Sequence, residues 1–191
     1  SDVNGNDNDG GGSPSFRVDL RGRGIRLGGG TDRFSPVGGG ISGTGSVTVL
    51  GTPGYRTTFQ SMVNTYSGAT VVAAGGTLQI NGDEMIPNNS DVTVDGVFQM
   101  NTGAETFDAL DGTGVVQNIT GGGRTITVGA DGGSGIFAGR LGPGAGGGTL
   151  LLVKAGAGTQ TLGGTSDNAS ATARLNTGTL VLAKSSGPSV H

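Results

Sequence analysis

Apolar and polar residues alternate with a period of two in short segments of this chain, and glycine-rich turns separate the segments. This period predicts half-buried β-strands, because successive side chains of a strand point to opposite faces. Strands of this length that recur about every 8–12 residues are typical of a sandwich, a barrel or a solenoid. We expect strands over residues 16–20, 46–50, 69–73, 77–80, 92–94, 98–100, 106–110, 115–119, 124–128, 150–153, 172–175 and 179–183.

Two distant stretches carry the same pattern of Thr, five residues and then Gly-Thr-Leu. A recurring pattern of this kind predicts stacked, near-equivalent units around a continuous core. Outward positions rich in Thr and Ser and corners rich in Gly favour the solenoid, with about eight to ten turns of roughly 20 residues. The recurring residues are Thr70, Gly76, Thr77 and Leu78 in the first copy and Thr172, Gly178, Thr179 and Leu180 in the second.

The composition excludes several other classes of fold. Glycine accounts for 43 of 191 residues, and each Gly costs about 1 kcal/mol relative to Ala inside a helix, so an all-β chain is expected. Collagen is excluded because the glycines do not fall at every third position. Disorder is the main competitor, but apolar runs such as 150–153 can bury surface, which a purely solvated chain cannot.

Composition also divides the chain into three parts and limits its partners. Residues 1–15 form a polar N-terminal segment rich in Gly, Asn and Asp, residues 16–184 form the solenoid, and residues 185–191 form a polar tail. The net charge of −3 gives no field that attracts nucleic acid. No apolar run approaches the roughly 18 residues of a membrane span. Because Ser1 begins the chain without an initiator Met or a signal peptide, we expect a processed form or an excised segment.

The first Gly-Thr-Leu copy lies within a longer motif, Asn64-Thr65-Tyr66-Ser67-Gly68-Ala69-Thr70-Val71-Val72 followed by Gly76-Thr77-Leu78-Gln79-Ile80. This motif resembles the passenger-associated (autotransporter-associated) β-strand repeat of bacterial autotransporters. The second copy departs from the pattern, because Asp167-Asn168-Ala169 stands where Asn-Thr-Tyr is expected and Ser170 replaces a glycine. The resemblance implies a right-handed parallel β-helix in one elongated domain, export to the bacterial cell surface and a structural role.

Little catalytic or metal-binding chemistry is indicated. His191 is the only His and there is no Cys, which argues against Ser-His-Asp and Cys-His nucleophiles and standard zinc sites. A carboxylate-only enzyme that cleaves polysaccharides is the alternative, although these acids also suit turn capping. Its candidate residues are Asp83, Glu84, Asp91, Asp95, Asp108 and Asp111. Alternating oxygen ligands at Asp2, Asn4, Asn6 and Asn8 make a weak calcium candidate that lacks the usual Gly and Glu.

Basic residues are concentrated near the start of the solenoid. Arg17, Arg21, Arg23 and Arg26 occur within ten positions, with few aromatic residues beside them to stack bases. Their spacing fits a solvated strand face, or an electrostatic contact with an acidic surface of a neighbouring subunit.

These observations predict a non-enzymatic, extracellular structural protein. A solenoid exposes unpaired backbone groups at its two ends, and such edges pair with other chains unless they are capped. We therefore expect self-association into a bacterial surface fibre or filament through end-to-end contacts, without a cofactor. The alternatives are a stalk segment of an autotransporter-type adhesin, with cell-surface glycans as partners of the whole protein, and the polysaccharide-cleaving β-helix enzyme.

Overall fold

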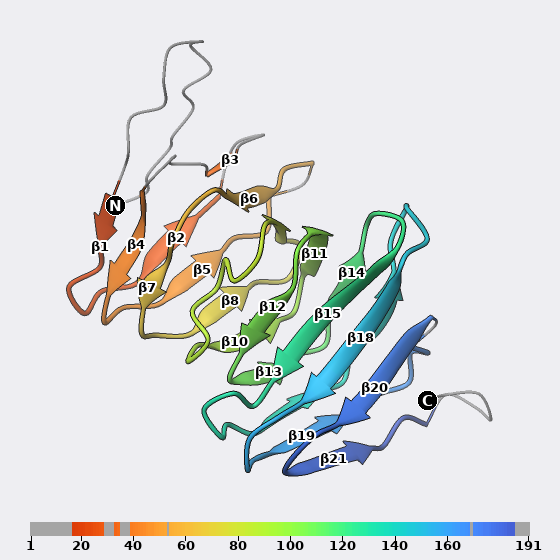
Figure 1. Ribbon diagram of the computed structural model, residues 1–191. Coiled ribbons are helices and arrows are strands. Elements are labelled where there is room, and N and C mark those ends of the chain that lie inside the picture. Colours follow the sequence, from red (N-terminus) through yellow and green to blue (C-terminus); the bar gives the residue numbers. More distant parts are fainter. Residues whose placement is uncertain (1–16, 29–32, 35–38, 53, 169, 186–191) are drawn as a thin grey trace.

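The computed structural model describes residues 17–28, 33–34, 39–52, 54–168 and 170–185. Within these ranges the chain is all-β, has no helix and forms a parallel β-solenoid of about seven turns (Figure 1). The predicted solenoid is thus confirmed. The expected N-terminal segment 1–15 lies outside the described residues, as does the expected tail 185–191 except for residue 185.

Twenty-one short strands build the solenoid within the described residues, and most begin or end beside a glycine. Their bounds are β1 (Arg17–Asp19), β2 (Ile25–Leu27), β3 (Arg33–Phe34), β4 (Gly40–Gly43), β5 (Val47–Val49), β6 (Thr57–Gln60), β7 (Thr65–Tyr66), β8 (Thr70–Val72), β9 (Thr77–Asn81), β10 (Asp91–Val94), β11 (Val97–Thr102), β12 (Glu105–Phe107), β13 (Ala109–Asp111), β14 (Val115–Asn118), β15 (Gly123–Val128), β16 (Gly135–Phe137), β17 (Arg140–Pro143), β18 (Thr149–Lys154), β19 (Thr159–Leu162), β20 (Ala171–Leu175) and β21 (Thr179–Leu182).

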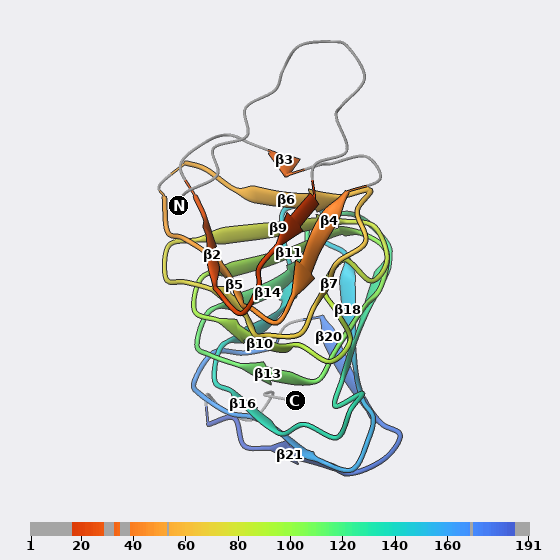
Figure 2. The same ribbon diagram turned by 90° about the vertical axis from the view of Figure 1, so that its left-hand side faces the viewer.

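Successive strands visit three faces in turn, so that each turn lies on the one before (Figure 2). Face 1 has β1-β4-β7 and then, after a turn without a strand, β12-β15-β18-β20. Face 2 has β2-β5-β8-β10-β13 and then β16-β19-β21, joined by the bridge between Gly112 and Phe137. Face 3 has β3-β6-β9-β11-β14-β17. Every pair is parallel, so the backbone hydrogen bonds run along the axis of the solenoid.

The turns differ in length, and this difference corrects the expected number of turns. Asp91 pairs with Ala109 (109 − 91 = 18), whereas Gly123 pairs with Thr149 (149 − 123 = 26). The chain therefore makes about seven turns instead of eight to ten. Turn length varies because the corners, and not the strands, absorb insertions.

Inward side chains stack into continuous apolar columns. On face 2 the burial pattern of β5, β8 and the end of β10 repeats as buried, half-buried, buried. In β8 the inward residues are Thr70 and Val72, while Val71 points outward. Phe98 on face 3 and Phe107 on face 1 pack edge to face in the core, with ring centroids 6.4 Å apart.

Glycine permits the close stacking of corners. Gly103 has φ = 80°, and a Cβ there would lie 2.2 Å from the carbonyl oxygen of Gly82 in the adjacent turn. Only glycine fits this left-handed position against neighbouring backbone. The abundance of glycine thus follows from the tight stacking of the turns.

The two Gly-Thr-Leu copies lie on different faces. Thr77 begins β9 on face 3, whereas Thr179 begins β21 on face 2. Thr70 begins β8 on face 2, and Thr172 lies in β20 on face 1. The residues mark strands as expected, but the two copies are offset by one face and are not equivalent positions of the solenoid.

Candidate functional site

The acidic residues that sequence analysis singled out bind backbone amides of adjacent turns. The Oδ1 atoms of Asp83, Asp95 and Asp111 accept the N–H groups of Ala104, Thr113 and Ile136 at 2.8, 3.1 and 2.8 Å. Asp108 Oδ1 accepts two, from Asp131 and Gly133, both at 2.8 Å. Glu84 accepts the hydroxyl of Thr106 at 3.0 Å. These contacts match the turn-capping interpretation of the acids.

Asp91, the remaining acidic candidate, lies at the exposed start of β10. Burial raises the pKa of its carboxyl, and the negative charges of Asp108 and Asp111 raise it further. The charges of Asp108 and Asp111 thus act on the Asp91 carboxyl beside face 2.

A buried carboxylate that sequence analysis did not single out lies at the centre of the solenoid. Glu105 begins β12 with no exposed surface, and its two oxygens accept the N–H groups of Met85 at 3.1 Å and Ile86 at 2.6 Å. Met85 and Ile86 occupy the turn of face 1 that lacks a strand. Glu105 thus replaces the missing strand pairing on that face. Burial raises the pKa of Glu105 to about 8, although the two backbone hydrogen bonds lower it.

Asn64 binds the same strandless segment from the other side. Its side-chain oxygen accepts the N–H of Ile41 at 2.8 Å, and its Nδ2 donates to the carbonyl of Met85 at 2.6 Å. Asn64 and Glu105 together connect β4 to β12 across the gap in face 1. The strand alternation of Glu105-Thr106-Phe107 carried the signal for this role, because an inward Phe107 implies an inward Glu105.

Three buried hydroxyl groups form a chain of hydrogen bonds near Glu105. The Tyr66 and Thr70 hydroxyls lie 2.5 Å apart, and Thr70 lies 3.0 Å from the Ser90 hydroxyl, which donates to the carbonyl of Gly68 at 2.9 Å. Burial raises the pKa of Tyr66. A nucleophile needs a neighbouring base and access to substrate; here all three hydroxyls are buried and bonded to one another. The arrangement therefore satisfies buried polar groups inside the core.

Two buried lysines occupy corners near the C-terminal end. The ammonium group of Lys154 donates to the carbonyls of Ala155 and Gly156, and that of Lys184 donates to the carbonyl of Gly139. Burial lowers the pKa of both lysines. They connect corner carbonyls, in the same way that the aspartates connect corner amides.

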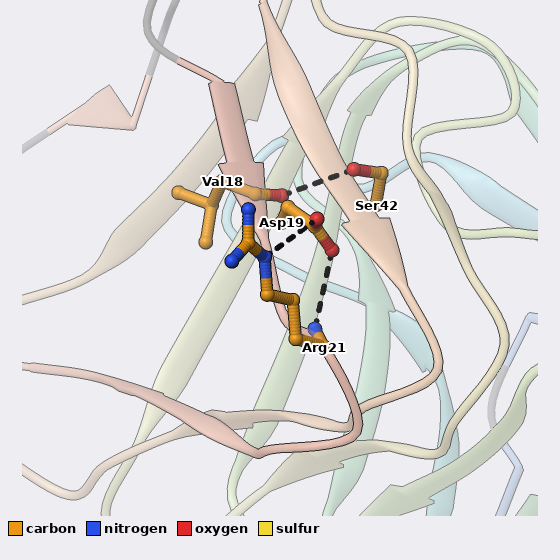
Figure 3. Close-up of polar contacts among 4 residues, drawn as sticks. All are labelled: Val18, Asp19, Arg21 and Ser42. Atoms are coloured by element: carbon orange, nitrogen blue, oxygen red, sulfur yellow. Dashed lines mark hydrogen bonds and ion pairs between the residues drawn. The ribbon is translucent and has the colours of Figure 1, made fainter.

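The four arginines of the candidate subunit contact lie exposed around the first turn. Arg17, Arg21, Arg23 and Arg26 all point to solvent. Figure 3 shows Arg21 beside Asp19, whose carboxylate accepts the backbone N–H at 3.1 Å and the Nε–H at 3.2 Å, while the Ser42 hydroxyl donates to the Val18 carbonyl at 3.3 Å. In this pair, 83% of the Arg21 side chain is exposed. The cluster is available to a partner, and the ion pair orients one of its members.

Neither a metal cluster nor a membrane-spanning helix is found in the part of the chain that the structure describes. No group of three or more His, Cys, Asp or Glu side chains lies close enough to hold an ion there. The weak calcium candidate at Asp2, Asn4, Asn6 and Asn8 falls outside those residues. The same part of the chain contains no helix that could cross a bilayer.

The last turn that the structure describes, here called the open C-terminal end, leaves inward apolar side chains exposed. In the last turn Leu175 and Leu182 continue the inward columns of Lys154 and Leu162, yet 51% and 46% of their surfaces are exposed. A hollow of about 140 Å³ opens among the side chains at this end. Its walls are Leu141, Leu162, Asn168, Ala171, Thr172, Ala173 and Leu182.

The fold defines this chain as a three-faced parallel β-solenoid. No family model, curated protein or solved structure matches it.

Proposed function

We propose that this chain is a non-enzymatic building block of a bacterial surface fibre, in which subunits join end to end. The observation that carries the proposal is the open C-terminal end described above. Apolar side chains at inward positions normally lie covered, and exposed apolar surface of this kind marks an interaction site.

Edge strands on matching faces support an end-to-end contact. Among the described strands, β20 and β21 are the last members of faces 1 and 2, and β1 and β2 are the first members of the same two faces. All strands run parallel, so β20 and β21 of one subunit can pair with β1 and β2 of the next without a change of direction. Such a contact is head-to-tail and produces an open filament.

The roles of the polar residues support a structural protein over an enzyme. The carboxylates at 83, 95, 108 and 111 hold backbone amides of adjacent turns, and Glu105 is enclosed in the core. A pair of catalytic carboxylates must instead flank a substrate. The resemblance to the autotransporter-associated repeat is the ground for placing the fibre at the cell surface.

The double variant Leu175→Asp/Leu182→Asp tests the end-to-end contact. We expect the wild-type chain to form filaments visible by electron microscopy and species larger than a monomer by sedimentation. The variant should lose the filaments, because charges at the open end prevent burial of the apolar surface. Val63→Asp is the matched control, since Val63 is 76% exposed but lies on the side of the solenoid between β6 and β7. Filaments that survive in Leu175→Asp/Leu182→Asp would overturn the proposal.

A further inference from the structure

The outer side of the first five strands of face 2 carries one row of residues with opposite charges at its two ends, and face 2 continues beyond this row with β16, β19 and β21. Strand pairing places Arg26, Thr48, Val71, Thr93 and Asp111 next to one another in register across β2, β5, β8, β10 and β13. Arg26 is exposed, and the other four are half-buried. At about 4.8 Å per strand, Arg26 and Asp111 lie roughly 19 Å apart, with Val71 at the midpoint.

The residues beside this row are mostly small. The positions two residues to either side are Gly24, Ser46, Ala69, Asp91 and Ala109 on one flank and Gly28, Leu50, Ala73, Asp95 and Thr113 on the other. Leu50 is the one large apolar residue among them. Small side chains allow a second sheet to approach at the usual separation of about 10 Å.

Charge is divided between the β2 end and the β13 end of these five strands. Arg23 and Arg26 are exposed at the β2 end. At the other end the N–H of Ile136 fixes the Asp111 carboxylate. Burial raises the pKa of Asp91 there, and repulsion by Asp108 and Asp111 raises it further. A cation placed at this end would relieve that repulsion.

We propose that two copies of this chain pair through the outer sides of face 2, with their long axes antiparallel and a two-fold axis along β8. Arg26 of each copy then lies opposite Asp111 of the other, Thr48 opposite Thr93, and Val71 opposite Val71. A two-fold contact requires a self-complementary surface, and this row has opposite charges at equal distances from its centre.

The charges of this row favour a second copy in this orientation over other binding partners. A parallel arrangement of two copies would place Arg26 on Arg26 and Asp111 on Asp111, which costs several kcal/mol. A polyanion would be repelled by the acidic end of the row and a polycation by the basic end. The contact is lateral, and it is independent of the end-to-end contact proposed above.

Charge reversal tests this pairing directly. Alone, Arg26→Asp and Asp111→Arg should each raise the dissociation constant of the pair about 100-fold or more, since each places like charges together. An equimolar mixture of the two variants should form a 1:1 heterodimer. In that heterodimer the introduced aspartate faces the introduced arginine, and the remaining native Asp111 faces the remaining native Arg26. Sedimentation velocity in the Leu175→Asp/Leu182→Asp background measures this without interference from end contacts.

Two matched variants separate the contact from general charge effects. Arg17→Asp makes the same charge change on face 1 and should leave the pairing intact. Val71→Lys should abolish pairing at the centre of the row and touches no carboxylate cap, so it covers the case in which Asp111→Arg fails to fold. A monomeric parent chain, a mixture that stays monomeric with both variants folded, or pairing that survives Val71→Lys would each overturn the proposal. If end contacts do not exist, the aspartate background leaves the parent chain unchanged and the lateral pair is still measured.

Discussion

The first and last turns of the solenoid follow the same alternation of apolar and polar residues, but they differ in burial. Ile25 and Leu27 in the first turn are only 5% and 3% exposed, whereas Leu175 and Leu182 in the last are 51% and 46% exposed. The alternation therefore decides which side chains point inward, but it does not decide whether other residues cover them. Association at the C-terminal end would therefore bury apolar side chains that the described chain leaves exposed.

Truncation of an inward leucine in each turn is expected to give the largest effect and to test this comparison most directly. Leu27→Ala should lower the free energy of unfolding by about 2–5 kcal/mol, as for a buried leucine. Leu182→Ala should lower it by less than about 1 kcal/mol, because nearly half of that side chain is already in water. Urea titration at a concentration where the chain is monomeric measures both. Equal losses would show that the last turn is as well covered as the first.

Glu105 lies between these two ends, and its titration should give the next largest effect. Its pKa is raised from an ordinary 4.5 to about 8 in the folded chain, so the folded state holds a proton that the unfolded state has lost. The free energy of unfolding should therefore be highest below about pH 4.5 and fall by about 1.4 kcal/mol per pH unit toward pH 8.

Glu105→Gln should remove most of this slope, because the amide oxygen still accepts a backbone N–H but does not titrate. Urea midpoints measured between about pH 5 and pH 7.5 give the slope. Glu84→Gln is the control, since Glu84 is exposed and binds the Thr106 hydroxyl. Its charge raises the pKa of Glu105 less than burial does, so the slope should persist in this variant. A slope that persists in Glu105→Gln would contradict the assignment to this residue.

The arginines of the first turn are expected to give the smallest effect on stability. Arg21→Ala should change the free energy of unfolding by less than about 0.5 kcal/mol, because its ion pair with Asp19 is exposed and exposed pairs contribute little. Thermal unfolding at low and high salt measures this contribution. A larger, salt-dependent loss would mean that the first turn is held by charge as well as by its apolar residues.

The prediction of the fold from sequence succeeded because the strand period and the glycine corners are local properties. Val47 and Val49, and likewise Val92 and Val94, face inward as their alternation requires. The number of turns could not be derived in this way, because the Gly-Thr-Leu copies lie on different faces and do not mark one turn. The spacing between the two copies is a number of residues, whereas the number of turns depends on how many residues each corner contains.

The roles of the polar residues were also predicted only in part. Aspartates beside glycine were expected to cap turns, and Asp95 and Asp111 do bind amides of the following turn. The buried roles of Glu105, Asn64 and Lys154 were not identified from the sequence. Their partners lie about a turn away or at a corner, so no local pattern names them. Calcium binding by the N-terminal acids and amides stays a prediction.

The sequence by itself determined that this chain forms short parallel strands stacked at glycine corners, because alternation and glycine act over a few residues. Only the tertiary structure decided that one turn of face 1 lacks a strand and that Glu105 and Asn64 bridge it. It also decided which end of the column stays open and that Arg26 and Asp111 share one row. Those features depend on the register between turns, and register is set by the packing of residues far apart in the chain.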